Sequence, residues 1–480
     1  MATVSVEKGT VAQQIARFVH DLSLDDVPDP VRKRAKLHLL DALGIGIASS
    51  GMDFGESVHR ASSRLGDSAE SSVLGFGTQL PASSAALANG TLIHGLDFDD
   101  THIQAIHHAT APALAAALAV GEAEHADGSS VLLAYIIGLE IGCRLAAAAP
   151  GEFHDRGLHP TGIMGTFAAA CAAGKLREVG PETLVNAMGL CGSQAAGILE
   201  MNRSWLKRFH PGWAAHAGII ASTLAEEKFL GPVTVFEGSK GLYASHLGRV
   251  PNVEALSLND FGTRWMCSEI ALKPYPCCHF LHAFIEAALH LREAHGVNPE
   301  DIARIVCPVS ERLIPVVTEP IAEKTAPGTI YDALFSLQYS VALAIVRHRV
   351  DLSTYYDNPV DDPAVMALAC RVVCHPDPKS DYPLHFPGEV EMHLNDGRVL
   401  RHRLASSLGS PERPLSENQV KAKFHANAER EMSVQGAQKV VNTVDRIEGL
   451  PDIGELLVAC STSRASDASP LDLKRKVPNL

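Results

Sequence analysis

Small and apolar residues recur at helical spacing through most of the first 265 residues. Residues 31–49 follow Pro30, which suits the first turn of a helix, and their leucines and isoleucines are typical of a largely buried helix. Alanine-rich segments that hold few β-branched residues predict further helices at 83–94, 111–125, 128–149, 161–177 and 181–199. Their small residues would let neighbouring helix backbones approach closely.

The pattern changes after about residue 272. Residues 301–309 alternate between apolar and polar positions, as a half-buried strand does. Two more alternating runs, within 389–404, flank Asn395-Asp396-Gly397, and the Asp-Gly pair favours a tight hairpin turn. Helical patterns persist at 281–295 and 331–346, and from about residue 416 the chain is helical again.

The predicted fold class is therefore mainly α. A large all-helical domain would comprise residues 1–271 and 411–480. A smaller α+β lid domain, residues 272–410, would be inserted before the C-terminal helices.

Composition narrows the functional classes. The formal charge is −14, from 41 basic and 55 acidic residues, which argues against a nucleic-acid partner. Apolar runs such as 111–120 are shorter than the roughly 18–20 residues that span a bilayer, and the N-terminus lacks the layout of a signal peptide. The cysteines form no Cys-x-x-Cys pair, so no zinc motif is indicated. We expect a cytoplasmic protein without a membrane partner.

The densest polar cluster lies between two predicted helices. It comprises His94, Asp97, Asp99, Asp100, Thr101, His102, His107 and His108. Three carboxylates and four imidazoles are costly to bury without partners. The cluster could be a solvated loop, a metal site, or a set of acid–base groups in which carboxylates orient histidines.

Three further segments carry candidate chemistry just before predicted helices. His159 precedes the small-residue helix that Thr161 could cap, or it is a structural turn residue. Lys207 lies in a basic segment before a helix predicted at 213–228, and this segment would bind an anion or be a solvated loop. Lys273 lies on a proline-rich stretch at the predicted domain boundary, where ligand clefts are common, although a plain linker fits as well. Tyr331 and Tyr339 are most simply packing aromatics.

Taken together, these segments resemble the MmgE/PrpD family from about residue 15 to about residue 456. The motifs that carry the resemblance are Asp97-Phe98-Asp99-Asp100-Thr101, His159-Pro160, the Lys207 segment, Phe236-Glu237-Gly238 with Gly241, Lys273-Pro-Tyr-Pro-Cys-Cys and Ser336-Leu-Gln-Tyr339. The resemblance implies a helical domain with an α+β lid, a homodimer, and no cofactor or metal. Its members include 2-methylcitrate dehydratase, cis-aconitate decarboxylase and iminodisuccinate epimerase.

The resemblance also implies a set of site residues. These are Asp97, Thr101, His107, His159, Lys207, Lys273 and Tyr339. In this chain the histidine at 107 is followed by His108 and Ala109, where the family usually has proline and a small residue, so either His107 or His108 would face the ligand.

The roles follow from carbanion chemistry beside a carboxylate. Lys207 and Lys273 would bind substrate carboxylates, with Thr101 and His108 also contacting the substrate, and Lys207 would stabilise the developing charge. His107 and His159 would move the proton, Asp97 would orient a histidine, and Tyr339 would donate to the intermediate.

The resulting hypothesis is a cofactor-independent lyase that acts on a small di- or tricarboxylic acid. A dehydratase of the 2-methylcitrate type is the first expectation, with a cis-aconitate-type decarboxylase or an iminodisuccinate-type epimerase as alternatives. From another class, a metal-dependent hydrolase would use His94, Asp97, Asp99, His107, His154 and Asp155 as ligands, and a non-catalytic helical scaffold would leave these side chains exposed.

Overall fold

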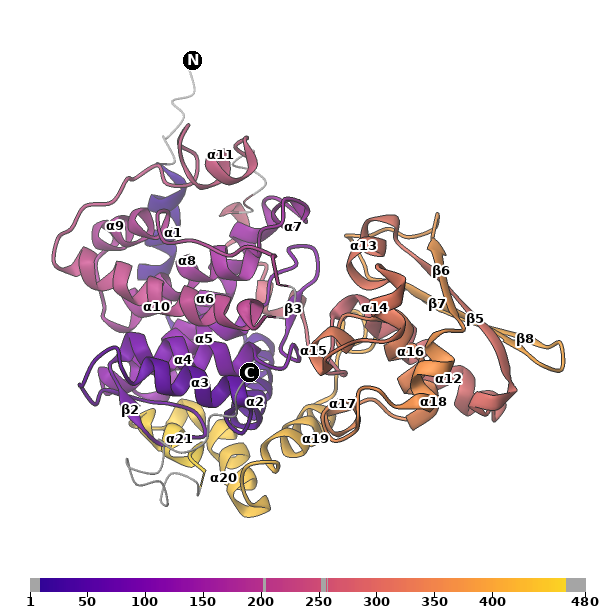
Figure 1. Ribbon diagram of the computed structural model, residues 1–480. Helices are drawn as coiled ribbons and strands as arrows, with labels where there is room; N and C mark the ends of the chain where they lie inside the picture. Colours follow the sequence, from indigo (N-terminus) through magenta and orange to yellow (C-terminus); the bar gives the residue numbers. More distant parts are fainter. Residues whose placement is uncertain (1–8, 202–203, 252–255, 257, 463–480) are drawn as a thin grey trace.

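The computed structural model describes residues 9–201, 204–251, 256 and 258–462, and it is mainly helical. Figure 1 shows a large helical body beside a smaller one that contains a β-sheet. We call these the large domain and the small domain.

The large domain contains the predicted helices of the first half of the chain. Its helices are α1 (Val11–Asp21), α2 (Asp29–Ser50), α3 (Asp53–Ser62), α4 (Ala82–His94), α5 (Thr110–Ala123), α6 (Gly128–Ala147), α7 (Glu152–Asp155), α8 (Pro160–Leu176), α9 (Pro181–Cys191), α10 (Leu206–Glu226) and α11 (Leu242–Leu247). Short strands pair as β1 (Ser71–Ser72) with β2 (Gln79–Leu80), and β3 (Thr101–His102) with β4 (Ile270–Ala271). The predicted close approach of helix backbones is confirmed where α4 packs on α10. A Cβ added to Gly90 would lie only 2.8 Å from the Cα of Gly212, so only glycine fits there.

Two predicted helix boundaries in this domain were wrong. The helix at 181–199 ends at Cys191, because the chain then turns to bring the Gly197 carbonyl to the backbone N–H of His159 at 3.0 Å. The helix predicted from residue 213 starts at Leu206 and contains Pro211. A proline within a helix removes one intrahelical hydrogen bond and crowds the carbonyl four residues earlier, yet here the helix continues through it. Lys207 therefore lies in the first turn of α10 rather than in a loop before it.

We expected only apolar runs too short to span a bilayer, but α6 is an apolar helix of 20 residues. By length and composition alone it could cross a membrane, but 89% of its most apolar window is buried inside the protein. Such burial is also what the core helix of a water-soluble domain shows.

The small domain is built on a four-stranded sheet. Its strands β5 (Ile302–Val309), β6 (Val372–Pro376), β7 (Gly388–Leu394) and β8 (Val399–Leu404) lie in the order β6-β5-β7-β8. The predicted hairpin is the antiparallel pair β7 and β8, whereas β5 and β6 are parallel. Its helices are α12 (His282–His295), α13 (Ile314–Val317), α14 (Ile321–Thr325), α15 (Ile330–Ala333), α16 (Leu337–Arg347), α17 (Leu352–Tyr356) and α18 (Pro363–Ala369).

The last helices return to the large domain. Helix α19 (Glu417–Ala428) packs on α2, and α20 (Val434–Asp445) and α21 (Gly454–Ala459) pack on each other beside it (Figure 1). Buried residues between 424 and 460 share one apolar core with residues 11–270, and a second core lies mainly within residues 271–394. That the small domain moves as a lid stays a prediction.

Candidate active site

Two lysines from distant parts of the chain bind one buried carboxylate, that of Asp97. Lys207 Nζ donates to Asp97 Oδ1 at 2.5 Å. Lys273 follows β4 at the junction of the domains, and its Nζ donates to the same oxygen at 3.2 Å and to the backbone carbonyl of Asp97 at 2.8 Å. Asp97 itself lies just after α4 with a positive φ of 50°, a backbone conformation that aspartate tolerates better than most residues. Three predicted site residues thus meet at one point.

The charges of these three side chains stabilise one another. Burial alone would raise the pKa of Asp97, but the ammonium groups of Lys207 and Lys273 outweigh burial and hold this pKa well below its usual range. Burial opposes the charged form of Lys273, yet the carboxylate of Asp97 outweighs it and raises the lysine pKa. Asp97 is therefore a carboxylate and Lys273 an ammonium at neutral pH.

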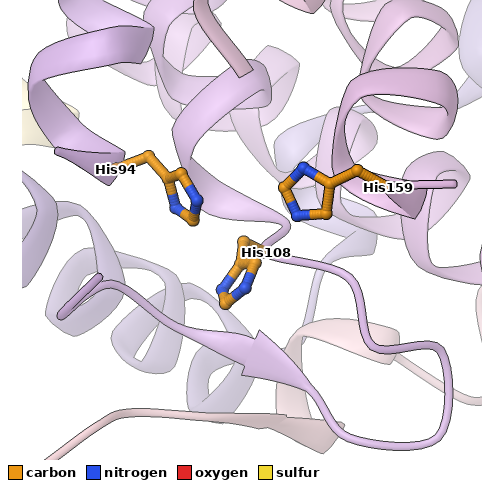
Figure 2. A group of neighbouring side chains, drawn as sticks. All are labelled: His94, His108 and His159. Carbon is orange, nitrogen blue, oxygen red and sulfur yellow. The ribbon is translucent and has the colours of Figure 1, made fainter. Parts of the chain in front are cut away.

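Three histidine rings face one another beside these charges. Figure 2 shows His94 at the end of α4, His108 before α5 and His159 before α8, with their rings turned towards a shared centre. Lys207 Nζ lies 3.3 Å from His94 Nε2 and 3.5 Å from His108 Nε2. Because an ammonium only donates hydrogen bonds, both Nε2 atoms accept from it.

The other ring nitrogen of each of these two histidines is also held. His94 Nδ1 lies 2.8 Å from a carboxylate oxygen of Asp99, and His108 Nδ1 lies 2.8 Å from the backbone carbonyl of Asp100. Both rings thus carry their hydrogen on Nδ1, which donates to these oxygens. Burial first, and then the charge of Lys207, keeps the pKa of His108 well below its usual value. His108 is accordingly neutral near pH 7.

His159 has a different partner. Its Nδ1 lies 2.9 Å from Nδ1 of His210, and its Nε2 has no hydrogen-bond partner within the described part of the chain, although the side chain is almost fully buried. Burial, followed by the charge of Lys207, lowers its pKa well below the usual value. His159, and not Thr161, is the N-cap residue of α8.

Two threonines hold the backbone and ring of His108. Thr101 Oγ1 lies 3.3 Å from His108 Nδ1, and Thr161 Oγ1 accepts the backbone N–H of His108 at 3.0 Å. Thr161 is thus occupied by this contact rather than by capping its own helix. Thr101, predicted to contact the substrate, also lines the pocket described below.

His107 does not belong to this group, so of the two alternatives that the sequence left open the structure favours His108. His102 and His107 exchange backbone hydrogen bonds at 2.8 and 3.3 Å, and Ile106 between them has a positive φ of 49°. This tight turn directs His107 towards α6, where a Cβ added to Gly142 would lie 2.8 Å from His107 Nε2. His108 is the histidine of this segment that faces the pocket.

Tyr339, which the resemblance assigns to the site, does not line the pocket described below, in keeping with its simpler interpretation as a packing aromatic, and its part in the reaction stays a prediction. It lies in the first turn of α16, where its backbone N–H donates to Ser336 Oγ at 3.0 Å, and it belongs to the core of the small domain. Burial first, and then the nearby carboxylate of Asp362, raises its pKa to about 12. Tyr331 instead lines the larger, outer cavity that is described below, and its ring centroid lies 4.3 Å from the guanidinium carbon of Arg208.

Buried charges behind the Asp97 segment were missed by the sequence reasoning. Lys423 of α19 donates to the backbone carbonyl of Phe98 at 2.8 Å and pairs with Asp41 of α2 at 2.8 Å. On the same side, His38 Nδ1 lies 3.0 Å from a carboxylate oxygen of Asp100. These contacts come from elements far apart in the sequence, and no local pattern marks them.

The converging side chains line an inner pocket between the domains. It is lined by Asp97, Thr101, Ile106, His108, His154, His159, Leu199, Met201, Lys207, Lys273, Cys278, His279, Phe280, Val316, Phe335 and Phe386. This inner pocket has a volume of only about 50 Å³, but it adjoins an outer cavity of about 660 Å³, with which it shares His154, Leu199, Met201, Val316 and Phe335. One wall of the inner pocket therefore carries the positive charges of Lys207 and Lys273, and the opposite wall is mostly apolar.

The ligand set proposed for a metal-dependent hydrolase is only partly gathered. His94, Asp97 and Asp99, together with His108, have ligand atoms within 4.8 Å of one another, whereas His107 points elsewhere and Asp155 pairs with Arg312. The ammonium of Lys207 already lies among these atoms, at 2.5 Å from Asp97 and 3.3 Å from His94. The ammonium of Lys207 therefore occupies the place among these ligand atoms that a divalent ion would need.

Two protein-family models match this chain, one mainly over the large domain and one mainly over the small domain. The model of the MmgE/PrpD N-terminal domain matches residues 13–253, and that of the MmgE/PrpD C-terminal domain matches residues 275–448. The chain belongs to the MmgE/PrpD family. The resemblance inferred from the Asp97 motif is thereby confirmed.

Several MmgE/PrpD relatives align over nearly the whole chain. A cis-aconitate decarboxylase-like protein of Aspergillus oryzae is 27% identical and covers 96% of this chain and 99% of its own. The cis-aconitate decarboxylase of Mus musculus is also 27% identical, over 93% of this chain and 92% of its own. The mitochondrial 2-methylcitrate dehydratase of Yarrowia lipolytica is 23% identical, and the alignment covers 81% of this chain and 78% of its own. Decarboxylation is thus at least as well supported as the dehydration expected first.

Proposed function

We propose that this chain is a lyase that acts on a small polycarboxylic acid through a carbanion beside a carboxylate, and that it releases carbon dioxide. The observation that carries the proposal is the meeting of Lys207 and Lys273 at one carboxylate, next to His108 and His159, which are neutral and line the same pocket. Two fixed ammonium groups bind anions, and neutral imidazoles can accept or donate a proton near pH 7.

In the proposed reaction, the positive charges of Lys207 and Lys273 attract a carboxylate that remains on the substrate. The carboxylate to be lost lies against the apolar wall, which includes Ile106, Phe280 and Val316. Its C–C bond breaks, carbon dioxide leaves, and the electron pair stays on a carbon conjugated with the carboxylate held by the lysines. That carbon then takes a proton from His159, and solvent restores the proton. Moving the departing carboxylate out of water favours its loss as a neutral molecule.

Decarboxylation is preferred for two reasons. The relatives of 27% identity are named for cis-aconitate decarboxylation, and an apolar wall suits a leaving group that becomes uncharged. Dehydration remains the second candidate because one relative is a 2-methylcitrate dehydratase. Loss of hydroxide would need a proton donor on the same wall, and His154 is the polar ring that the two cavities share there.

The small domain is proposed to open and close as a lid. The inner pocket is too small for a tricarboxylic acid, since about 50 Å³ holds only a few waters. Arg312 of the small domain pairs with Asp155 of the large domain beside the outer cavity, and this contact would break on opening. Small-angle scattering should show a smaller radius of gyration with a bound acid, and an unchanged radius would contradict a lid.

The reaction is tested by incubating the purified chain with a panel of acids and identifying the products by mass spectrometry. The panel includes cis-aconitate, citrate and 2-methylcitrate. The proposal expects a product lighter than cis-aconitate by one carbon dioxide. Loss of water from 2-methylcitrate, with cis-aconitate untouched, would replace decarboxylation by dehydration, and no turnover of any acid would overturn the lyase proposal.

A further inference from the structure

His210 is buried beside the site but has no role in the proposed reaction so far. It lies on α10 three residues after Lys207, so that one helix face brings Lys207 to the pocket and His210 to the ring of His159. Helix α10 is fixed closely against α4, where Gly90 meets Gly212. The ring of His210 is therefore held firmly against that of His159, with centroids 5.1 Å apart.

The contact between these two rings has a strict chemical requirement. Nδ1 of His159 lies 2.9 Å from Nδ1 of His210, and a hydrogen bond between two ring nitrogens needs a hydrogen on one of them only. If His159 donates, its Nε2 carries a lone pair towards the pocket. If His210 donates, Nε2 of neutral His159 carries a hydrogen towards the pocket. The partner ring thus decides whether His159 faces the ligand as a base or as a proton donor.

An anionic ligand in the pocket favours the second arrangement. The pocket holds the ammonium groups of Lys207 and Lys273 and is built for anions, so an N–H on His159 is complementary to its ligand and a lone pair is not. Lone pairs already face this space from His94 Nε2 and His108 Nε2, and the hydrogens of Lys207 satisfy them. Nε2 of His159 is the buried ring nitrogen of the three that has no partner among the described residues.

We propose that His210 is a positioning residue that donates its Nδ1–H to His159 and thereby keeps an Nε2–H of His159 directed at the substrate carbanion. The inference rests on the proposed function, in which His159 supplies the proton. Beyond that function, it states which ring nitrogen of His159 carries the hydrogen and names His210 as the residue that decides this. The proton that leaves His159 Nε2 forms the new C–H bond, and solvent returns one proton to the pair for each turnover.

The tautomer can be measured without any substrate. In the wild-type protein with ¹⁵N-labelled histidines, two-bond ¹H–¹⁵N spectra report which ring nitrogen carries the hydrogen, and His159→Gln and His210→Asn assign the two rings. The proposal expects a protonated Nε2 and an accepting Nδ1 on His159. A hydrogen on Nδ1 of His159 would overturn it, whether or not any acid is turned over.

The kinetic test compares two substitutions of His210. His210→Phe removes the donor, and kcat should fall by about 10²–10⁴-fold with KM changed less than about threefold. His210→Asn places an amide N–H near the position of Nδ1, and it should recover kcat to within about tenfold of wild type. His216→Phe on the same helix is the matched control, because its ring bonds the backbone carbonyl of Ser83 far from the pocket, and its kinetics should be those of wild type.

Circular dichroism and thermal unfolding confirm that each variant is folded. Wild-type kinetics in His210→Phe would overturn the proposal. Equal losses in His210→Phe and folded His210→Asn would also overturn it, because the hydrogen-bond donor would then not matter. A failure of all acids in the panel removes the proposed function instead, and the spectra of wild type still decide the tautomer.

Discussion

The ammonium group of Lys273 binds Asp97 twice, through the backbone carbonyl at 2.8 Å and through Oδ1 at 3.2 Å. Lys273 is fully buried and lies where the chain leaves β4 for the small domain. The contact therefore fixes the strained turn at Asp97, with its positive φ, to the junction of the domains. The same ammonium has one further hydrogen, which is left for a ligand at the edge of the inner pocket.

Replacement of either lysine should weaken catalysis strongly. Lys207→Met and Lys273→Met each remove one charge-assisted hydrogen bond, worth roughly 1.5–3 kcal/mol, so kcat/KM should fall at least about 10–150-fold. Arginine should rescue poorly at either position, because its planar fork does not replace a compact ammonium in a tight pocket. Steady-state kinetics on the turned-over acid provide the measurement.

The matched control for the lysines is Lys33→Met, which changes an exposed lysine of α2. Its kinetics should equal those of wild type. Both lysines would be excluded from the site if Lys207→Met and Lys273→Met were folded and as active as this control.

The two neighbouring histidines before α5 should respond differently. His108→Ala removes a ring that lines the inner pocket and accepts from Lys207, so kcat should fall about 10²–10⁴-fold if it takes part in proton transfer. His107→Ala should leave kcat within about threefold and act instead on stability, since it opens a cavity against α6. A silent His108→Ala together with an inactive, folded His107→Ala would contradict the placement of the two rings.

Buried histidines predict a loss of stability in mild acid. Burial lowers the pKa to about 4 for His38, His102 and His210, and to about 3 for His107 and His279. The unfolded chain takes up these protons near pH 6.5, and the folded chain does so only near pH 4 or below. Between these values the unfolded state binds more protons, so the free energy of unfolding decreases as the pH falls.

Urea unfolding at several values between pH 7.5 and pH 4.5 measures this effect. Asp41 and Glu140 act in the opposite sense, because burial raises their pKa to about 6 and about 7, but the histidines outnumber them. The midpoint should decrease steadily below pH 6.5. A midpoint that stays constant or rises as the pH falls would contradict the buried neutral histidines.

Removal of metal ions separates the lyase from the hydrolase hypothesis. Because Lys207 provides the positive charge among His94, Asp97 and His108, activity should be unchanged after exhaustive chelation. Activity lost to the chelator and restored by one divalent ion would favour the metal-dependent hydrolase, and Lys207→Met should then bind that ion more tightly.

The sequence predicted most of the helices and several residues that the structure brings together at the pocket, since periodicity and family motifs are local signals. It could not distinguish His107 from His108, because the positive φ of Ile106 and the backbone bonds to His102 decide which ring faces inward. Only the resemblance placed Tyr339 in the site, and the structure places it in the core of the small domain.

Long-range partners escaped prediction for a different reason. Lys423 reaches the carbonyl of Phe98 only because α19 returns to pack on α2. The segment around Lys207 was predicted to precede a helix at 213–228, but it lies within α10, which brings His210 to His159. Contacts of this kind depend on how the elements pack, which spacing along the chain does not encode.

The most direct test of the carbanion is turnover of cis-aconitate in deuterium oxide, followed by NMR and mass spectrometry of the product. The account predicts one carbon-bound deuterium for each carbon dioxide released. It also predicts that the rate of incorporation falls by about 10²–10⁴-fold in His159→Ala. An acid that is turned over without any carbon-bound deuterium in the product or in recovered substrate would contradict carbanion chemistry at this site.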